Sequence, residues 1–138
     1  MIIVDSGFWI ALSNNQDQHH FPAIKLLSQL DEDLITSVPV MTEVCHILLK
    51  RQGIKAQLSF MKAYERGAFE VFQFSHAQRG RITVLMEQYA NLPMDLADAS
   101  LVLLAEHLGH GCILSTDKRD FNTYRWKNTK PFLNLFNC

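Results

Sequence analysis

The sequence has no long apolar segment. None of its hydrophobic runs approaches the ~20 residues of a membrane-spanning helix. The first residues also lack the basic region and the small-residue cleavage site of a secretory signal. From these absences we expect a cytoplasmic protein with no membrane partner.

Cysteine is scarce, and neither sign of charge is in excess. Cys45, Cys112 and Cys138 are odd in number and widely separated, which argues against a disulfide framework or a four-thiolate zinc site. Thirteen basic and fourteen acidic residues give a net charge of -1, which argues against a general binder of polyanions. A glycine-rich phosphate loop and a nucleophile elbow are also missing.

The sequence does contain enough apolar material for one core. Hydrophobic residues make up 48% of the 138 positions, so we expect a single domain over residues 1–138. Predicted strands and helices alternate, a pattern typical of a three-layer α/β/α sandwich with a mostly parallel central sheet. We expect strands at Met1–Val4, Leu34–Thr36, Phe69–Phe74, Cys112–Ser115 and Phe132–Phe136. We expect helices at Phe8–Leu12, Phe21–Leu30, Pro39–Arg51, Gln57–Arg66, Ser75–Tyr89 and Asp95–Leu108, and a short turn or helix after Lys118.

Two acidic residues come directly after predicted strands. Asp5 follows the apolar run Ile2–Val4, and Asp117 follows Cys112–Thr116. Because ligands of parallel α/β sheets bind outside the carboxyl ends of the strands, both carboxylates should project into one crevice. Carboxylates crowded together need cations, and hard oxygen ligands suit Mg²⁺ or Mn²⁺. The sequence therefore predicts a metal site at this end of the sheet.

Two predicted helices bring further acids. Glu43 shares an apolar helix face with Val40 and Ile47, where a carboxylate is costly to bury unless something pairs with it. A place in the first helical turn, where the macrodipole favours acids, is the alternative explanation. Asp95 and Asp98 lie in the first turn of a later helix, with Asp95 as the expected cap. Small and apolar neighbours surround Asp98, so we expect its carboxylate to point at the site.

Hydroxyls and a further acid lie next to these positions. Ser115 or Thr116 could orient a water at the metal beside Asp117. Ser6 offers a similar hydroxyl, although a turn-forming serine explains it equally well. Asp120 is expected to cap a short helix, with metal ligation as the alternative.

Four sequence blocks together carry a family resemblance. They are, in order, Ile3–Ser6, Thr42–Val44, Leu96–Val102 followed by Glu106, and Leu114–Phe121. The chain resembles the PIN domain of VapC-type toxin ribonucleases over essentially its whole length. The resemblance implies a PIN-like fold, Mg²⁺ or Mn²⁺ dependence and endonucleolytic cleavage of RNA. It also implies a small antitoxin partner that covers the acidic site, and a homodimer.

The resemblance assigns the catalytic, metal-binding quartet to Asp5, Glu43, Asp98 and Asp117. It leaves the roles of Asp95 and Asp120 open. Divalent ions held by such a quartet would activate water and orient a phosphodiester for in-line attack.

Basic residues gather near the C-terminus. Five of them fall within thirteen positions: Lys118, Arg119, Arg125, Lys127 and Lys130. A solvated surface is the ordinary explanation of such a group, but beside a metal site the first four could hold RNA phosphates. Tyr124 could stack on an unpaired base, whereas core packing is expected for Phe121 and Trp126.

Three other functions stay open. A housekeeping RNA-processing PIN nuclease would use the same chemistry without an antitoxin. A Mg²⁺-binding signalling module similar to a response-regulator receiver is disfavoured, because residues 50–70 contain no Asp to accept a phosphoryl group. A binding-only scaffold would carry the acids without chemistry, and their occurrence in family order argues against it.

Overall fold

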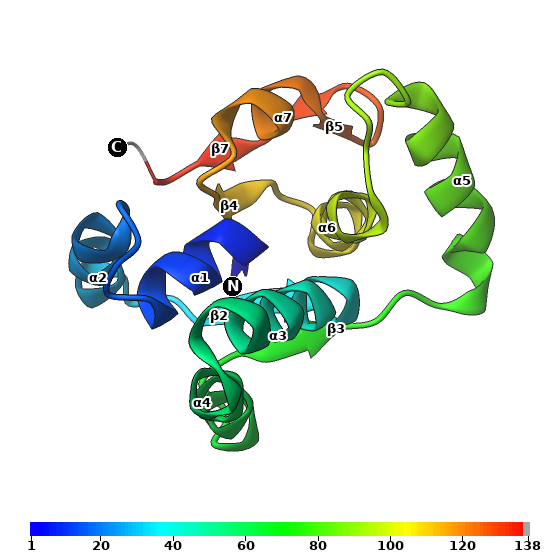
Figure 1. The fold of residues 1–138 in the computed structure, drawn as a ribbon. Helices are drawn as coiled ribbons and strands as arrows, with labels where there is room; N and C mark the ends of the chain where they lie inside the picture. Colours follow the sequence, from blue (N-terminus) through cyan, green and yellow to red (C-terminus); the bar gives the residue numbers. More distant parts are fainter. Residues whose placement is uncertain (137–138) are drawn as a thin grey trace.

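The computed structural model describes residues 1–136, and the chain folds around a five-stranded parallel sheet. The strands are β1 (Ile2–Val4), β2 (Leu34–Ser37), β3 (Glu70–Phe72), β4 (Cys112–Leu114) and β7 (Leu133–Asn134). Their spatial order is β3-β2-β1-β4-β7, and every pairing is parallel (Figure 1). The prediction of a mostly parallel central sheet is confirmed, and β1 lies at its centre.

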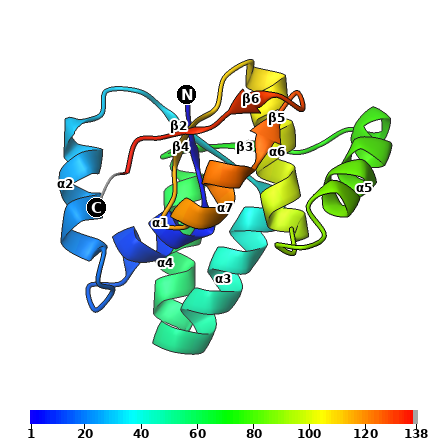
Figure 2. The same ribbon diagram turned by 90° about the horizontal axis from the view of Figure 1, so that it is seen from above.

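Helices lie on both sides of this sheet. They are α1 (Ser6–Ser13), α2 (His20–Gln29), α3 (Val38–Gln52), α4 (Ile54–Glu65), α5 (Arg79–Gln88), α6 (Leu96–Leu108) and α7 (Lys118–Thr123). A 3-10 helix (His76–Gln78) precedes α5. In Figures 1 and 2, α2 lies on one side of the strands and α5 and α6 on the other. The arrangement is the expected α/β/α sandwich.

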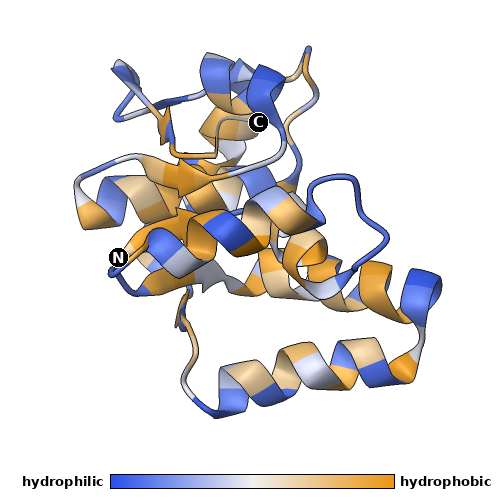
Figure 3. Ribbon diagram, turned by 90° about the vertical axis from the view of Figure 1, so that its left-hand side faces the viewer, coloured by the Kyte–Doolittle hydropathy of each residue, from blue (hydrophilic) through white to orange (hydrophobic). Residues whose placement is uncertain are grey.

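The two central strands are buried on both faces. Ile3 and Val4 of β1 and Ile113 and Leu114 of β4 are fully enclosed. Figure 3 shows hydrophobic residues concentrated along the central strands. Burial of apolar area stabilises the fold by roughly 25 cal/mol per Å², so the core holds these two strands in place. Asp5 follows the first strand directly, and Asp117, the N-cap of α7, follows the second after a short loop.

Two buried serines join α3 to α6. The hydroxyls of Ser37 and Ser100 lie 2.6 Å apart, and Ser100 donates to the carbonyl oxygen of Ala97. Ser37 also caps α3 by accepting a hydrogen bond from the Val40 amide. Because each helix carries a predicted site acid, this contact sets the distance between those acids.

The predicted ends of α3 and α6 are confirmed. Gly53 follows α3 with a φ of 95°, and Gly109 follows α6 with a φ of 80°, a region that favours glycine. The start of α3 differs from the prediction because the helix begins at Val38, and Glu43 therefore lies in its second turn. The explanation of Glu43 as a first-turn acid is wrong.

The C-terminal segment also differs from the prediction of one strand at Phe132–Phe136. The structure has an antiparallel hairpin of β5 (Arg125–Trp126) and β6 (Lys130–Pro131), followed by the short β7. Lys127 and Asn128 form its turn with φ values of 49° and 66°. The turn has no glycine, so the usual hairpin signal is missing from the sequence.

The cysteines and the helix lengths agree with the expectations where the structure describes them. Cys45 and Cys112 are free and half-buried, whereas Cys138 lies outside the described residues. Within residues 1–136, every helix is too short or too polar to cross a membrane.

Candidate active site

Asp5 is a buried carboxylate at the carboxyl end of β1. It caps α1, because its Oδ1 accepts a hydrogen bond of 2.7 Å from the Ser6 amide. Its Oδ2 accepts a hydrogen bond of 2.9 Å from the Ser115 hydroxyl. Only 5% of the residue is exposed, so both oxygens are held in one orientation.

Ser115 connects the ends of β1 and β4. While it donates to Asp5, its Oγ accepts a hydrogen bond of 2.9 Å from the Asp117 amide. Asp117 in turn caps α7, since its Oδ1 accepts from the Asp120 amide at 3.1 Å. A shared serine therefore joins the carboxylate of Asp5 to the backbone of Asp117 where the two neighbouring strands end.

Asp98 reaches the same region from α6. Asp95 is the N-cap of this helix, as expected, and accepts a hydrogen bond of 2.8 Å from the Asp98 amide. The Asp98 carboxylate accepts a hydrogen bond of 2.8 Å through Oδ2 from the Tyr124 hydroxyl. Asp95 itself is exposed, whereas Asp98 is half-buried.

The four predicted site acids lie in one electrostatic field. The pKa of Asp5 is raised from 3.8 to about 6, chiefly by burial and also by the charges of Glu43 and Asp117, against the hydrogen bonds from Ser6 and Ser115. For Asp98, burial raises the pKa from 3.8 to about 8, with contributions from Asp95, Asp5 and Asp117. Burial likewise raises the pKa of Asp117. Desolvation and like charge both oppose ionisation here.

A cation lies near this group of acids, because the charge of Arg119 lowers the pKa of Asp117, although burial raises that pKa overall. Ion pairs join the N-terminus to Glu32, Arg81 to Glu106, and Arg119 to Asp120. As the side chains stand, no three carboxylate, imidazole or thiolate groups in residues 1–136 are close enough together to hold a metal ion. Glu43 makes no hydrogen bond within the described chain and is half-buried, so its side chain is able to turn. The donor set fits a hard cation in chemistry and charge, and would need a side-chain rotation to enclose one.

The positions of Asp120 and Tyr124 in the structure differ from those predicted from the sequence. Asp117, not Asp120, caps α7, and Asp120 is buried and paired with Arg119 at 3.0 Å. Tyr124 is fully buried, so the prediction that it stacks on a base is wrong. Phe121 and Trp126 are buried, as expected.

The hydroxyl groups that the sequence placed beside the metal site differ in their contacts. The backbone amide of Ser6 donates a hydrogen bond to Asp5, and the Ser6 hydroxyl lies 3.4 Å from the same carboxylate. The Thr116 hydroxyl lies against Gly7, where an added Cβ would clash with Oγ1. Thr116 therefore fixes the start of α1, and the bridging hydroxyl belongs to Ser115. The sequence offered both residues and could not choose between them.

The basic residues are spread over two locations. Lys118 and Arg119 lie on the exposed first turn of α7. The Arg125 guanidinium donates to the carbonyl oxygens of Asn122, Thr123 and Tyr124. The backbone amide of Lys127 donates a hydrogen bond of 2.6 Å to the Glu106 carboxylate. Since Glu106 lies eight residues beyond Asp98 on α6, about 12 Å at 1.5 Å per residue, Lys127 is distant from the acids.

These features define a parallel α/β domain with acidic residues near the ends of its central strands. The chain belongs to the PIN domain family, whose model matches residues 2–127. It is 23% identical over 124 residues to Ribonuclease VapC26 of Mycobacterium tuberculosis, a match that covers 90% of this chain and 92% of that protein.

A solved structure has the same fold. The crystal structure of the Mycobacterium tuberculosis VapC20 toxin, which cleaves the Sarcin-Ricin loop, matches with a TM-score of 0.78 and 20% sequence identity. The match covers 85% of this chain and 90% of that one. The resemblance to VapC-type PIN domains is confirmed.

The raised pKa of Asp98 predicts a pH-dependent loss of stability. Between its unfolded value of 3.8 and its folded value of about 8, the folded chain binds the proton more tightly, so stability falls as pH rises through this window. Asp98→Asn removes this penalty. We therefore expect the difference in unfolding free energy between the variant and wild type, measured without divalent ions, to grow by on the order of 2 kcal/mol from pH 4 to pH 9. One pKa unit corresponds to roughly 1.4 kcal/mol, and relaxation of the structure around the charge reduces the total.

Urea denaturation of both proteins across this pH range measures the difference. Asp31→Asn, at an exposed position, is the matched control and should show a difference that does not change with pH. A constant difference for Asp98→Asn would contradict the predicted burial penalty.

Proposed function

We propose that the protein is a metal-dependent endoribonuclease of the VapC type and acts as the toxin of a toxin-antitoxin pair. The observation that carries this proposal is the Asp5–Ser115–Asp117 linkage at the ends of β1 and β4, with Asp98 facing the same region. The family membership and the two relatives, one a ribonuclease and one a toxin that cleaves the Sarcin-Ricin loop, support it.

The chain would hold a divalent cation with four carboxylates. Asp5 and Asp98 are oriented by hydrogen bonds from Ser115 and Tyr124. Glu43 and Asp117 would supply the remaining carboxylates. A bound Mg²⁺ or Mn²⁺ supplies the charge that lowers the pKa of water and stabilises the developing charge on a phosphodiester.

The first turn of α7 would contact the substrate. Lys118 and Arg119 are exposed and follow Asp117 directly, so they can reach phosphates on either side of the reacting one. Arg125 is occupied by backbone carbonyl groups. Lys127, together with Lys130, lies near the Trp126 ring at 5.8 and 5.4 Å, where it could hold a more distant part of the RNA.

Removal of one anchored carboxylate should abolish cleavage. We expect Asp5→Asn and Asp98→Asn to remain folded and to lose at least 100-fold in Mn²⁺-dependent RNA cleavage, because activation of water and charge stabilisation depend on the cation. Asp31→Asn, exposed and outside the site, should keep wild-type activity.

The assay uses mixed RNA substrates with Mn²⁺, Mg²⁺ or EDTA. Equal cleavage by both site variants and wild type would contradict the proposed site. Activity that survives EDTA would contradict metal dependence, and a folded wild-type protein that neither binds Mn²⁺ nor cuts RNA would favour a binding-only scaffold.

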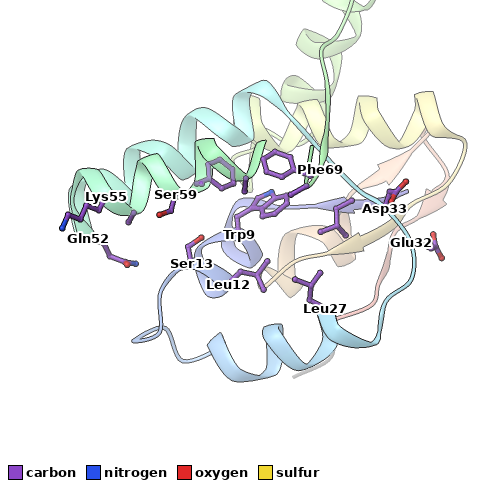
Figure 4. Close-up of a pocket in the computed structure, with 15 residues that line it drawn as sticks. Trp9, Leu12, Ser13, Leu27, Glu32, Asp33, Gln52, Lys55, Ser59 and Phe69 are labelled. Atoms are coloured by element: carbon purple, nitrogen blue, oxygen red, sulfur yellow. The ribbon is translucent and has the colours of Figure 1, made fainter. Parts of the chain in front are cut away.

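An apolar hollow of about 620 Å³ between α1, α2 and α4 would receive the antitoxin (Figure 4). Its apolar lining comes from Trp9, Leu12, Leu27, Leu34, Phe60 and Phe69. A second hollow, of about 310 Å³, lies further along α1 and is lined by Ser6, Arg51 and Thr116, next to the acids. An amphipathic helix placed in the first hollow could therefore extend a segment toward the acidic site.

Filling this hollow should block neutralisation by an antitoxin. Ser59 lines it from α4 and is exposed, so Ser59→Arg should leave the toxin active but reduce rescue of cell growth by the co-expressed antitoxin. Thr83→Arg, at an exposed position of α5, is the matched control. Full neutralisation of Ser59→Arg would place the antitoxin elsewhere.

An apolar face on α3 would form a homodimer. Val38 and Leu49 of α3 are 40% and 45% exposed, and Leu96 at the start of α6 is 44% exposed. Two hollows that share Val38, Thr42 and His46 lie along this face. Such a face is self-complementary about a two-fold axis when two copies meet.

A charge on this face should separate the dimer. We expect Leu49→Lys to be monomeric by sedimentation velocity at concentrations where wild type is dimeric, since burial of an unpaired ammonium group is unfavourable. Phe21→Lys changes an apolar residue on α2 that is 76% exposed and should stay dimeric. A monomeric wild type would refute the homodimer.

A further inference from the structure

The side chain of Tyr124 is held in one position within the core. It follows α7 directly and is fully buried. Its ring makes edge contacts with Tyr89 and Phe121, at centroid distances of 5.0 and 5.2 Å. Such contacts fix the orientation of an aromatic ring, so the hydroxyl can point in one direction only.

The Tyr124 hydroxyl points toward the carboxylate of Asp98. The Tyr124 hydroxyl donates to Oδ2 at 2.8 Å, whereas Oδ1 makes no hydrogen bond within residues 1–136. The backbone of Asp98 is fixed as well, because its amide donates to Asp95. One carboxylate oxygen is therefore occupied by the tyrosine, and the other is left for a ligand.

The same short helix links two of the site acids. Asp117 is the residue before α7 and Tyr124 is the residue after it. A helix of six residues is about 9 Å long, so α7 sets the spacing between the Asp117 carboxylate and the hydroxyl that orients Asp98. Both acids thereby depend on one structural element.

We propose that Tyr124 is a positioning residue that holds the carboxylate of Asp98 so that Oδ1 faces the divalent cation. This inference rests on the proposed function, since it requires a cation at the acidic site. Groups that hydrogen-bond to a metal ligand typically change metal affinity by 10–100-fold when they are removed. A purely structural tyrosine would instead change stability alone.

The chain provides a matched control in Tyr89. This tyrosine is also buried, packs against the Tyr124 ring, and accepts a hydrogen bond of 3.0 Å from the Arg125 amide through its hydroxyl. Tyr124→Phe and Tyr89→Phe each remove one buried hydroxyl and keep the ring. Only the first removal affects a site acid.

Isothermal titration with Mn²⁺ tests the proposal in wild type, Tyr124→Phe, Tyr89→Phe and Asp98→Asn. We expect Tyr124→Phe to bind Mn²⁺ at least ~10-fold more weakly than wild type and Tyr89→Phe to bind within about twofold. In RNA cleavage, Tyr124→Phe should need more Mn²⁺ for half-maximal rate and approach the wild-type rate at saturation. Urea denaturation should show both variants folded.

Each result decides one of the two ideas. Wild-type Mn²⁺ affinity in Tyr124→Phe, or an equal loss in Tyr89→Phe, would overturn the positioning role while the nuclease proposal stands. A wild-type protein that binds no Mn²⁺ would overturn the nuclease proposal and this inference with it.

Discussion

The buried carboxylate of Asp5 is the constraint on which the rest of the structure depends. Removing a carboxylate from water is costly unless hydrogen bonds replace the lost hydration. Here the Ser6 amide and the Ser115 hydroxyl provide them, one from the start of α1 and one from the end of β4. The two neighbouring strands must keep their register for this to hold, so the position of the acid and the pairing of the central strands are coupled.

The surrounding acids repel one another, and hydrogen bonds from uncharged groups hold the fold together around them. Asp98 accepts from Tyr124, Asp117 accepts from the Asp120 amide, and Ser37 contacts Ser100 where α3 meets α6. These contacts orient the acids without neutralising them. A group of charges left in this state stores unfavourable energy that a bound cation would release, and such sites commonly lower stability in favour of function.

Residues whose positions follow from the local sequence pattern were predicted correctly, whereas those whose contacts depend on the folded chain were not. Asp5 and Asp117 were found because each follows a continuous apolar strand, and the ends of parallel strands meet at one edge of a sheet. The role of Tyr124 was missed, because a tyrosine that follows a short polar helix has no pattern that distinguishes base stacking from burial. Arg125 and Lys127 were grouped by proximity in sequence, whereas the hairpin turn carries Lys127 to the far end of α6.

The sequence by itself determined the layer architecture, the central strands, the ends of α3 and α6, and the positions of Asp5 and Asp117 after neighbouring strands. These follow from apolar periodicity, turn residues and the order of charged positions, which are local properties. The tertiary structure alone decided which hydroxyl bridges Asp5 and Asp117, which group donates a hydrogen bond to Asp98, and which basic residues lie beside the acids. Those choices depend on contacts between residues far apart in the chain, such as Ser115 with Asp5 and Tyr124 with Asp98, and packing of the folded core is what brings them within hydrogen-bonding distance.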